Sequence, residues 1–223
     1  MVRSARWLGR AQVFLSYGMK VLMNRLRVIS ILAFPIVLSI GIVLIPVVSD
    51  YSNHELAEQA VEKTSRWFAG HLICTVAFGL SVWATSTIAN ELHRRSSRVP
   101  SIVLPLIAMG AGLYAAGLGA DGIGPIAVKS SGVSPMVFFN GSGWWVSGVF
   151  MVATLVFAAG LISLVIHVIR GGLVSGAWRY IVFGSALIFV SAPAIPSGWA
   201  LYGEAVAAIG VFVPIGISIG RSG

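Results

Sequence analysis

The sequence predicts an all-α polytopic membrane protein, a six-helix transmembrane bundle with an amphipathic interfacial helix at its N-terminus. Three observations carry this prediction: six long apolar runs, few charges within them, and basic residues concentrated on one side of the resulting map. Hydrophobic residues make up 57% of the chain and charged residues 10%, with a mean hydropathy of +0.91. We therefore expect a basic surface segment, 1–27, followed by one transmembrane domain, 28–223.

Each apolar run approaches or exceeds the ~20 residues that cross a hydrocarbon core as a helix. The runs are 28–48, 67–89, 102–120, 144–167, 178–195 and 199–219. Backbone in lipid must satisfy its own hydrogen bonds, so each run should be helical. The first is long for a signal peptide and lacks a small-residue cleavage site, which favours a retained signal anchor. Translation could still begin at Met1, Met19 or Met23.

The distribution of basic residues predicts the orientation. Twelve of the fifteen Lys and Arg residues fall on the side that holds both termini. The positive-inside rule then places both termini in the cytoplasm of a bacterium, with the chain in the inner (plasma) membrane. Tryptophans at the ends of several runs support the same map, because indole rings prefer the headgroup level. The net charge of +8 thus indicates anionic lipid as a partner and argues against nucleic acid.

The segment 1–27 carries basic residues on one helical face and leucines on the other. This pattern is typical of a helix that lies on a membrane surface. We expect its basic side chains to contact lipid headgroups: Arg3, Arg6, Arg10, Lys20 and Arg27.

Two outer connections separate the spans. The first, 49–66, is acidic, and its stretch 53–64 should form a short helix capped by Ser52 or Asn53. The second, 121–143, is rich in Gly, Ser and Pro and should be a long loop packed against the bundle mouth. A stripe of small residues in the third run should pack against another helix or form an oligomer seam: Ala108, Gly112, Ala116 and Ala120.

Three ionisable residues in or at the spans are the candidate functional site, because such groups are costly in a membrane. His71 and Glu204 lie roughly 6–8 Å below the outer boundary, and Asp121 closes the third run on the same side. One imidazole and two carboxylates could bind a metal ion, with Asp50, His54 or Glu55 adding a ligand, or could relay protons.

A structural role for the same residues is the alternative. His71 could bond a loop carbonyl, and Asp121 could end its helix. Glu204 could pair with Arg66 or Lys129. No catalytic residue is assigned, because haem, nucleotide, flavin and nucleophile-elbow signatures are lacking in the sequence.

The chain resembles the six-helix bacterial integral membrane proteins that are grouped as domains of unknown function. The resemblance is carried by Arg66-Trp67-Phe68-Ala69-Gly70-His71-Leu72 and by Gly119-Ala120-Asp121-Gly122. It implies a fold and a compartment and carries over no catalytic residue. The basic tail departs from that pattern.

The sequence favours a non-enzymatic accessory or scaffold protein that binds lipid and other membrane proteins. This preference follows from the few intramembrane charges and from the lack of an evident central pathway in the sequence. The alternatives are a small transporter or ion-coupled permease, or a membrane-embedded metal enzyme, using the outer cluster.

Overall fold

The computed structural model of the protein describes residues 2–221, except for the side chains of residues 2–17, 20, 21 and 143. Within that range every regular element is helical. The elements are α1 (Val2–Leu44), α2 (His54–Val61), α3 (Thr64–Arg94), α4 (Val103–Ser130), α5 (Met136–Arg170), α6 (Trp178–Ser191), the 3₁₀ turn η1 (Ala192–Ala194) and α7 (Gly198–Arg221).

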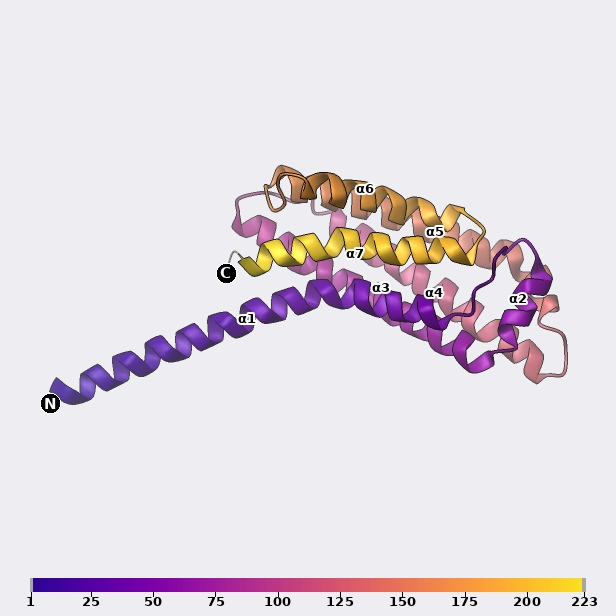
Figure 1. Ribbon diagram of the computed structural model, residues 1–223, viewed down its shortest axis with the longest axis horizontal. Helices are drawn as coiled ribbons and strands as arrows, with labels where there is room; N and C mark the ends of the chain where they lie inside the picture. The colour runs from indigo at the N-terminus through magenta and orange to yellow at the C-terminus, as the bar shows by residue number, and fades with distance from the viewer. Residues whose placement is uncertain (1, 222–223) are drawn as a thin grey trace.

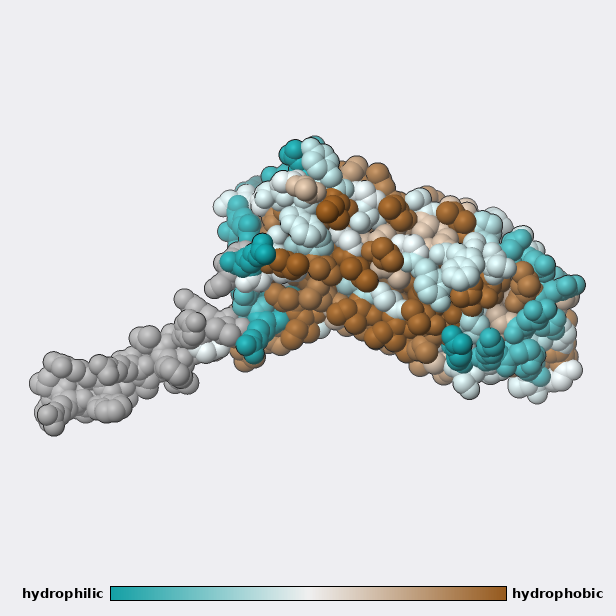
Figure 2. All heavy atoms as spheres, viewed as in Figure 1, coloured by the Kyte–Doolittle hydropathy of each residue, from teal (hydrophilic) through white to brown (hydrophobic). Residues whose placement is uncertain are grey.

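The helices form an elongated bundle with both described chain ends at one end (Figure 1). We call this the terminal end; it also holds the connections 95–102 and 171–177. The opposite, distal end holds α2 and the connections 45–53, 131–135 and 192–197. Hydrophobic residues cover the middle of the face seen in Figure 2, and hydrophilic residues gather toward both ends. This distribution is that of a protein whose middle lies in lipid.

Five helices of the described chain are long and apolar enough to cross a membrane, one fewer than predicted. They are the Leu22–Leu44 part of α1, α3, α4, the Trp144–Arg170 part of α5, and α7. The remaining apolar run, 178–195, forms α6, whose 14 residues reach about 21 Å at 1.5 Å per residue. Its α-helix gives way to the turn η1, where Pro193 lacks the N–H that a continuing helix requires.

Phe34 of α1 is the centre of the apolar core. Its ring lies 5.0–6.5 Å, between centroids, from one phenylalanine ring on each of four other helices. These partners are Phe78 of α3, Phe157 of α5, Phe189 of α6 and Phe212 of α7. Tilted and edge-to-face ring pairs are the favoured arrangements, so this cluster joins five helices at one level.

Helices α1 and α3 approach closely where two glycines face the opposite helix. A Cβ on Gly41 would lie 2.6 Å from Sγ of Cys74, and one on Gly70 would meet Ile45 at a still shorter distance. Contacts this short would push the helices apart. The two glycines therefore allow the backbones of α1 and α3 to pack against each other.

The predicted surface helix is instead the first part of α1, which runs unbroken from Val2 to Leu44 and extends beyond the bundle (Figure 1). No proline or glycine lies between Lys20 and Ile31, so nothing in the sequence breaks the helix at the expected boundary. The side chains of Arg3, Arg6, Arg10 and Lys20 lie outside the described residues, so their expected lipid contacts stay predictions.

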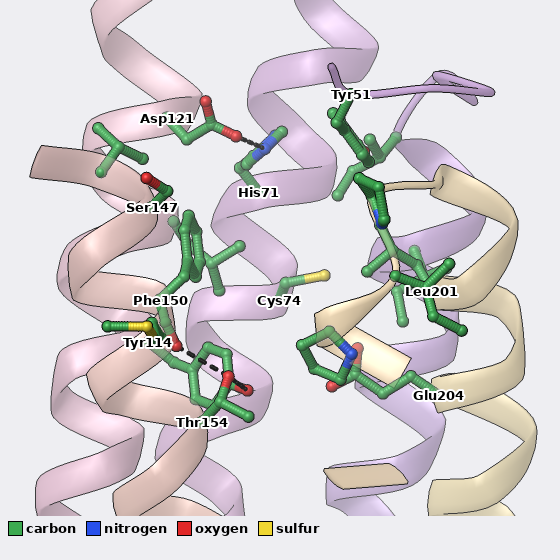
Figure 3. A pocket seen from close by; sticks show the side chains of 18 of the residues that line it. Tyr51, His71, Cys74, Tyr114, Asp121, Ser147, Phe150, Thr154, Leu201 and Glu204 are labelled. Carbon is green, nitrogen blue, oxygen red and sulfur yellow. Dashed lines mark hydrogen bonds and ion pairs between the residues drawn. The ribbon is translucent and has the colours of Figure 1, made fainter. Parts of the chain in front are cut away.

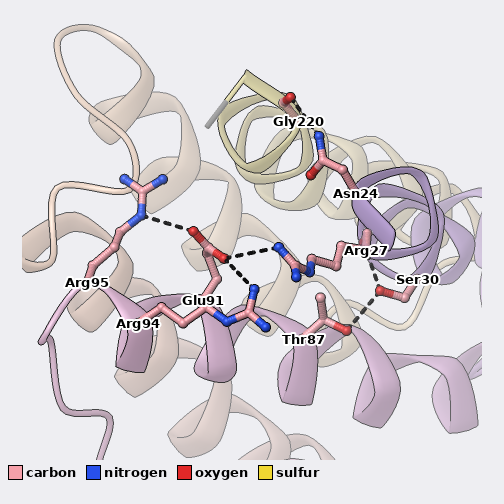
Figure 4. A network of polar contacts seen from close by, with 8 residues as sticks. All are labelled: Asn24, Arg27, Ser30, Thr87, Glu91, Arg94, Arg95 and Gly220. Carbon is pink, nitrogen blue, oxygen red and sulfur yellow. Dashed lines mark hydrogen bonds and ion pairs between the residues drawn. The ribbon is translucent and has the colours of Figure 1, made fainter. Parts of the chain in front are cut away.

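The side chain of Arg27 faces Glu91 of α3, with Nη1 3.9 Å from Oε2, and its expected contact with lipid headgroups stays a prediction. The Glu91 carboxylate also pairs with Arg94 and Arg95 of its own helix (Figure 4). Nearby, the side-chain amide of Asn24 donates to the carbonyl of Gly220 in α7. Polar contacts at the terminal end thus tie α1 to both α3 and α7.

The predicted long loop at 121–143 is wrong. Helix α4 continues to Ser130 and α5 begins at Met136, so only a five-residue turn, 131–135, joins them. Glycine and proline are tolerated in a membrane helix because neighbouring helices and local adjustments satisfy the freed backbone groups. The extension places Asp121 within α4 and not at its end.

Of the two roles expected for the small-residue stripe of α4, packing inside the bundle is wrong, and the oligomer seam stays a prediction. Ala108, Gly112, Ala116 and Ala120 are exposed, whereas Tyr114 is buried in the bundle. In α7, by contrast, Gly216 and Gly220 do pack internally, against Leu32 and Val28 of α1.

The short distal helix α2 confirms the predicted helix in the first outer connection. Its N-cap is Asn53, whose side-chain oxygen accepts from the backbone N–H of Glu55 at 3.1 Å. The buried face of α2 packs on Trp67 at the start of α3. This packing holds the N-terminal end of α3 in place, and the candidate site residue His71 lies one helical turn after Trp67.

Candidate functional site

His71 and Asp121 form a direct contact between α3 and α4. Nε2 of His71 lies 3.1 Å from Oδ2 of Asp121, and Nδ1 lies 2.7 Å from the carbonyl oxygen of Trp67, one helical turn earlier. The side chain of His71 is buried, and that of Asp121 is 20% exposed. The prediction that these two residues converge is therefore matched by the geometry.

Trp67 and Gly122 hold this pair in place. The indole Nε1 of Trp67 donates to the backbone carbonyl of Asp121 at 2.9 Å, and its ring lies 4.6 Å from the His71 ring between centroids. A Cβ on Gly122 would lie only 2.8 Å from Cβ of His71. The absence of a side chain at Gly122 is thus what lets α4 approach α3 at this level.

The contact between His71 and Asp121 requires a proton. The carbonyl of Trp67 can only accept, so Nδ1 carries the hydrogen that it donates. For Nε2 to bond Oδ2, one further hydrogen must sit either on the imidazole or on the carboxyl group. The bond between Nε2 and Oδ2 therefore needs one hydrogen in addition to the one on Nδ1.

Glu204 lies deeper, on α7, and has no hydrogen-bond or ion-pair partner among the described residues. It is 5% exposed, and its carboxylate points into the space between α7 and the helices α4 and α5 (Figure 3). The basic partners considered above are engaged elsewhere. Arg66 donates to the carbonyls of Val43 and Leu44, and Lys129 pairs with Glu62 at 2.7 Å. Burial of an unpaired charge is costly, so this carboxyl group must be neutral or receive a partner from outside the chain.

A cavity of about 720 Å³ connects these groups. His71 and Asp121 lie toward its distal mouth, and Glu204 lies toward its floor (Figure 3). Such a volume falls in the range of small-molecule sites, and apolar walls with a few polar groups are typical of them. No Lys or Arg is among the described residues that line the cavity.

The cavity also reaches the lateral surface of the bundle. Met151 and Leu155 of α5 and Ile195 near η1 line it, yet they are 53%, 65% and 57% exposed. These residues mark an apolar opening between α5 and the connection that leads into α7. In a membrane, such an opening faces acyl chains and not water.

The rim at the distal mouth is formed by two connections that bond to each other. The backbone N–H of Tyr51 donates to the carbonyl of Pro196 at 2.9 Å, and that of Gly198 donates to the carbonyl of Val48 at 2.7 Å. Burial raises the pKa of Tyr51, and the charge of Asp121 acts in the same direction. At the exposed Asp50, bonds from the hydroxyl and backbone N–H of Ser52 lower the pKa of the carboxyl group.

The structure does not gather the three predicted site residues into one metal-binding cluster. His71 and Asp121 meet, while Glu204 shares the cavity but touches neither of them through a hydrogen bond or ion pair among the described residues. Within the described chain, no group of three or more His, Cys, Asp or Glu side chains is placed to hold a metal ion. The proposed extra ligand His54 contacts Oδ1 of Asn140 through its Nδ1.

Sequence reasoning missed the polar and aromatic pair on the wall opposite Glu204. The hydroxyl oxygens of Tyr114 on α4 and Thr154 on α5 lie 2.7 Å apart, and the Tyr114 ring stacks on Phe78 with centroids 4.1 Å apart. The sequence signal was the spacing of Tyr114 between Gly110 and Gly117, which marks the closely packed face of α4. The small-residue stripe on the exposed face of α4 is the more regular pattern in the sequence, so the prediction relied on it and not on Tyr114.

No family model, curated protein or solved structure matches this chain. The family resemblance drawn from the motifs at Arg66–Leu72 and Gly119–Gly122 therefore stays a prediction.

Proposed function

We propose that the protein is a small permease of the bacterial inner membrane that takes a small, largely apolar molecule into its central cavity. The observation that carries this proposal is the buried, unpartnered Glu204 at the floor of a cavity that opens both distally and toward lipid. The sequence favours an accessory role because it shows no evident pathway through the membrane. The cavity, which extends from the distal mouth to Glu204, supports a pathway over that part of the bundle.

Orientation follows from charge. Twelve basic residues belong to the terminal end and three to the distal end, which supports a cytoplasmic position for both termini. The cavity mouth then faces the periplasm and the outer leaflet of the bilayer. A molecule that is apolar enough to dissolve in that leaflet can enter between α5 and the 192–197 connection.

The experiment is to block the cavity with a matched pair of substitutions on one helix. Leu201 of α7 lines the cavity, whereas Val206, on the same helix, is 69% exposed and does not line it. Purified protein in nanodiscs would be screened for thermal stabilisation by neutral, cationic and anionic aromatic compounds. We expect L201W to abolish the stabilisation and V206W to retain it. The proposal fails if no compound stabilises the protein, or if L201W responds as fully as the parent.

A second candidate is the accessory role, which the extension of α1 favours. The described helix projects beyond the bundle at the terminal end (Figure 1), and its sequence carries Arg3, Arg6, Arg10 and Lys20. Each basic residue near an anionic surface contributes about 1 kcal/mol. A peptide of residues 1–27 should gain helicity on anionic vesicles and lose that response at high salt. An equal response to neutral vesicles would exclude the electrostatic part of this role.

A further inference from the structure

We propose that the molecule bound in the cavity is a monovalent organic cation with an aromatic or aliphatic body, and that it displaces a proton from Glu204. This inference rests on the proposed function and adds the charge of the ligand. It follows from the charges and the walls of the cavity and from the burial of Glu204.

Among the described residues that line the cavity, the acids are Asp121 and Glu204, and no Lys or Arg is present. Asp121 already has His71 as a partner, so Glu204 is the acid without one. An ionised carboxylate that is 5% exposed needs a positive charge next to it. Without a Lys or Arg among these described residues, and with His71 and His54 in contact with Asp121 and Asn140, we infer that this charge comes from a ligand. An anionic ligand would meet the same carboxylate without any compensating base.

The walls suit an organic cation better than a metal ion. Aromatic rings line the cavity at several depths, including Phe78, Tyr114 and Phe150. The faces of such rings attract ammonium and phosphonium groups. A hard inorganic cation would require several oxygen ligands, whereas Glu204 is a single carboxylate surrounded mainly by apolar side chains.

Exchange of a proton for the cation follows from the burial of Glu204. Without ligand, the group avoids an unpaired buried charge by carrying a proton. On binding, the O–H bond breaks, the proton leaves to solvent, and the carboxylate pairs with the incoming cation. One positive charge enters and one leaves, so the cavity stays neutral and binding strengthens as the pH rises.

The other titratable groups around this cavity are few and can be separated from Glu204 in an experiment. Cys74 of α3 and Tyr114 of α4 line it, while His71, Asp121, Tyr51 and His54 lie toward its mouth. The lining residues from α1, α5, α6 and η1 carry no titratable side chain. A substitution that changes only the carboxyl group of Glu204 therefore tests the exchange of proton for cation directly.

The probes are tetraphenylphosphonium, tetraphenylborate and triphenylphosphine oxide, which share an aryl body and differ in charge. Binding to the full chain in nanodiscs would be measured by calorimetry at pH 5.5, 7 and 8.5, in buffers with different ionisation enthalpies. We expect the phosphonium to bind best, more tightly at pH 8.5 than at pH 5.5, with release of up to one proton per cation.

Variants of Glu204 separate the cation from the cavity. E204Q should weaken phosphonium binding by roughly 10- to 100-fold, since a contact to a charged group contributes on that order, and should abolish both its pH dependence and the proton release. E204D should retain both in part. Neutral triphenylphosphine oxide should bind E204Q as it binds the parent protein.

The outcomes distinguish this inference from the proposed function. If all three probes bind alike and phosphonium affinity does not vary with pH in the parent protein, the cation inference is overturned while the cavity still binds ligands. Preference for tetraphenylborate overturns it equally. If no probe binds the parent protein, both proposals fail. If E204Q does not fold, E204D decides the matter, because it leaves His71 and His54 unchanged: phosphonium affinity and proton release equal to those of the parent protein would overturn the inference.

Discussion

His71 and Asp121, fifty residues apart in the sequence, meet with Nε2 and Oδ2 separated by 3.1 Å. The same histidine donates from Nδ1 to the carbonyl of Trp67, so both ring nitrogens are occupied. This contact fixes the distance between α3 and α4 at the mouth of the cavity. Several consequences can be measured.

Removing the carboxyl group of Asp121 should destabilise the protein. D121A leaves Nε2 of a buried imidazole without a partner, which costs about 1–3 kcal/mol in the free energy of unfolding. D121N keeps a hydrogen-bonding group next to the ring and should cost less. Thermal unfolding of the two variants checks the order. As a control, D50A removes an exposed carboxylate whose bonds from Ser52 water can replace, and it should cost less stability than D121A. A D121A protein as stable as D50A would contradict the structural role.

A methyl group at Gly122 should separate the two helices. Its Cβ would lie 2.8 Å from Cβ of His71, whereas a Cβ on Gly119 of the same helix would meet nothing within 4 Å. We therefore expect G122A to lower the free energy of unfolding by about 1–3 kcal/mol, and G119A to raise it by up to about 1 kcal/mol, because alanine favours helix. Equal melting temperatures for the two variants would show that α4 does not approach α3 as described.

Tyr51 should make the protein sensitive to alkaline pH. Burial, with the charge of Asp121, raises the pKa of this phenol above its usual value of 10.0. A raised folded-state pKa means that the unfolded chain loses the phenolic proton first. The stability contributed by burying the neutral phenol is therefore complete below about pH 10 and is lost as the pH rises above it. Y51F should reduce the loss of stability between pH 9 and 12. A parallel decline in both proteins would contradict this assignment.

The topology predicts opposite accessibility for the two ends of the bundle. A tag after Gly223 should be protected from membrane-impermeant reagents in intact cells, because the distribution of basic residues predicts that the terminal end is inside. A cysteine in place of the exposed Ser130, the last residue of α4 at the distal end, should be labelled. The native Cys74 is buried, so the parent protein provides the background. Efficient labelling of the C-terminal tag from outside would invert the orientation, and with it the side to which the cavity opens.

The sequence alone determined that the long apolar runs are helical. It did not determine the relative depth of the polar groups, because His71 and Glu204 were expected at the same level and Glu204 lies deeper in the cavity (Figure 3). Hydropathy and the 1.5 Å rise per residue are local properties, and lipid forces a helical backbone on long apolar runs. The cap at Asn53 is equally local, because it depends on one side chain and the N–H groups next to it.

Tertiary packing decided the rest. The helix 103–130 continues through Gly122, Gly124 and Pro125 because neighbouring helices cover a segment that reads as a loop in isolation. The rotation of α4, which buries Tyr114 and exposes the alanine stripe, is set by the large rings packed around it. The cavity is the space that remains between the helices when they pack at these rotations. Its unpaired carboxylate could not be read from the chain, because whether Glu204 has a partner depends on side chains from six other helices and not on its neighbours in sequence.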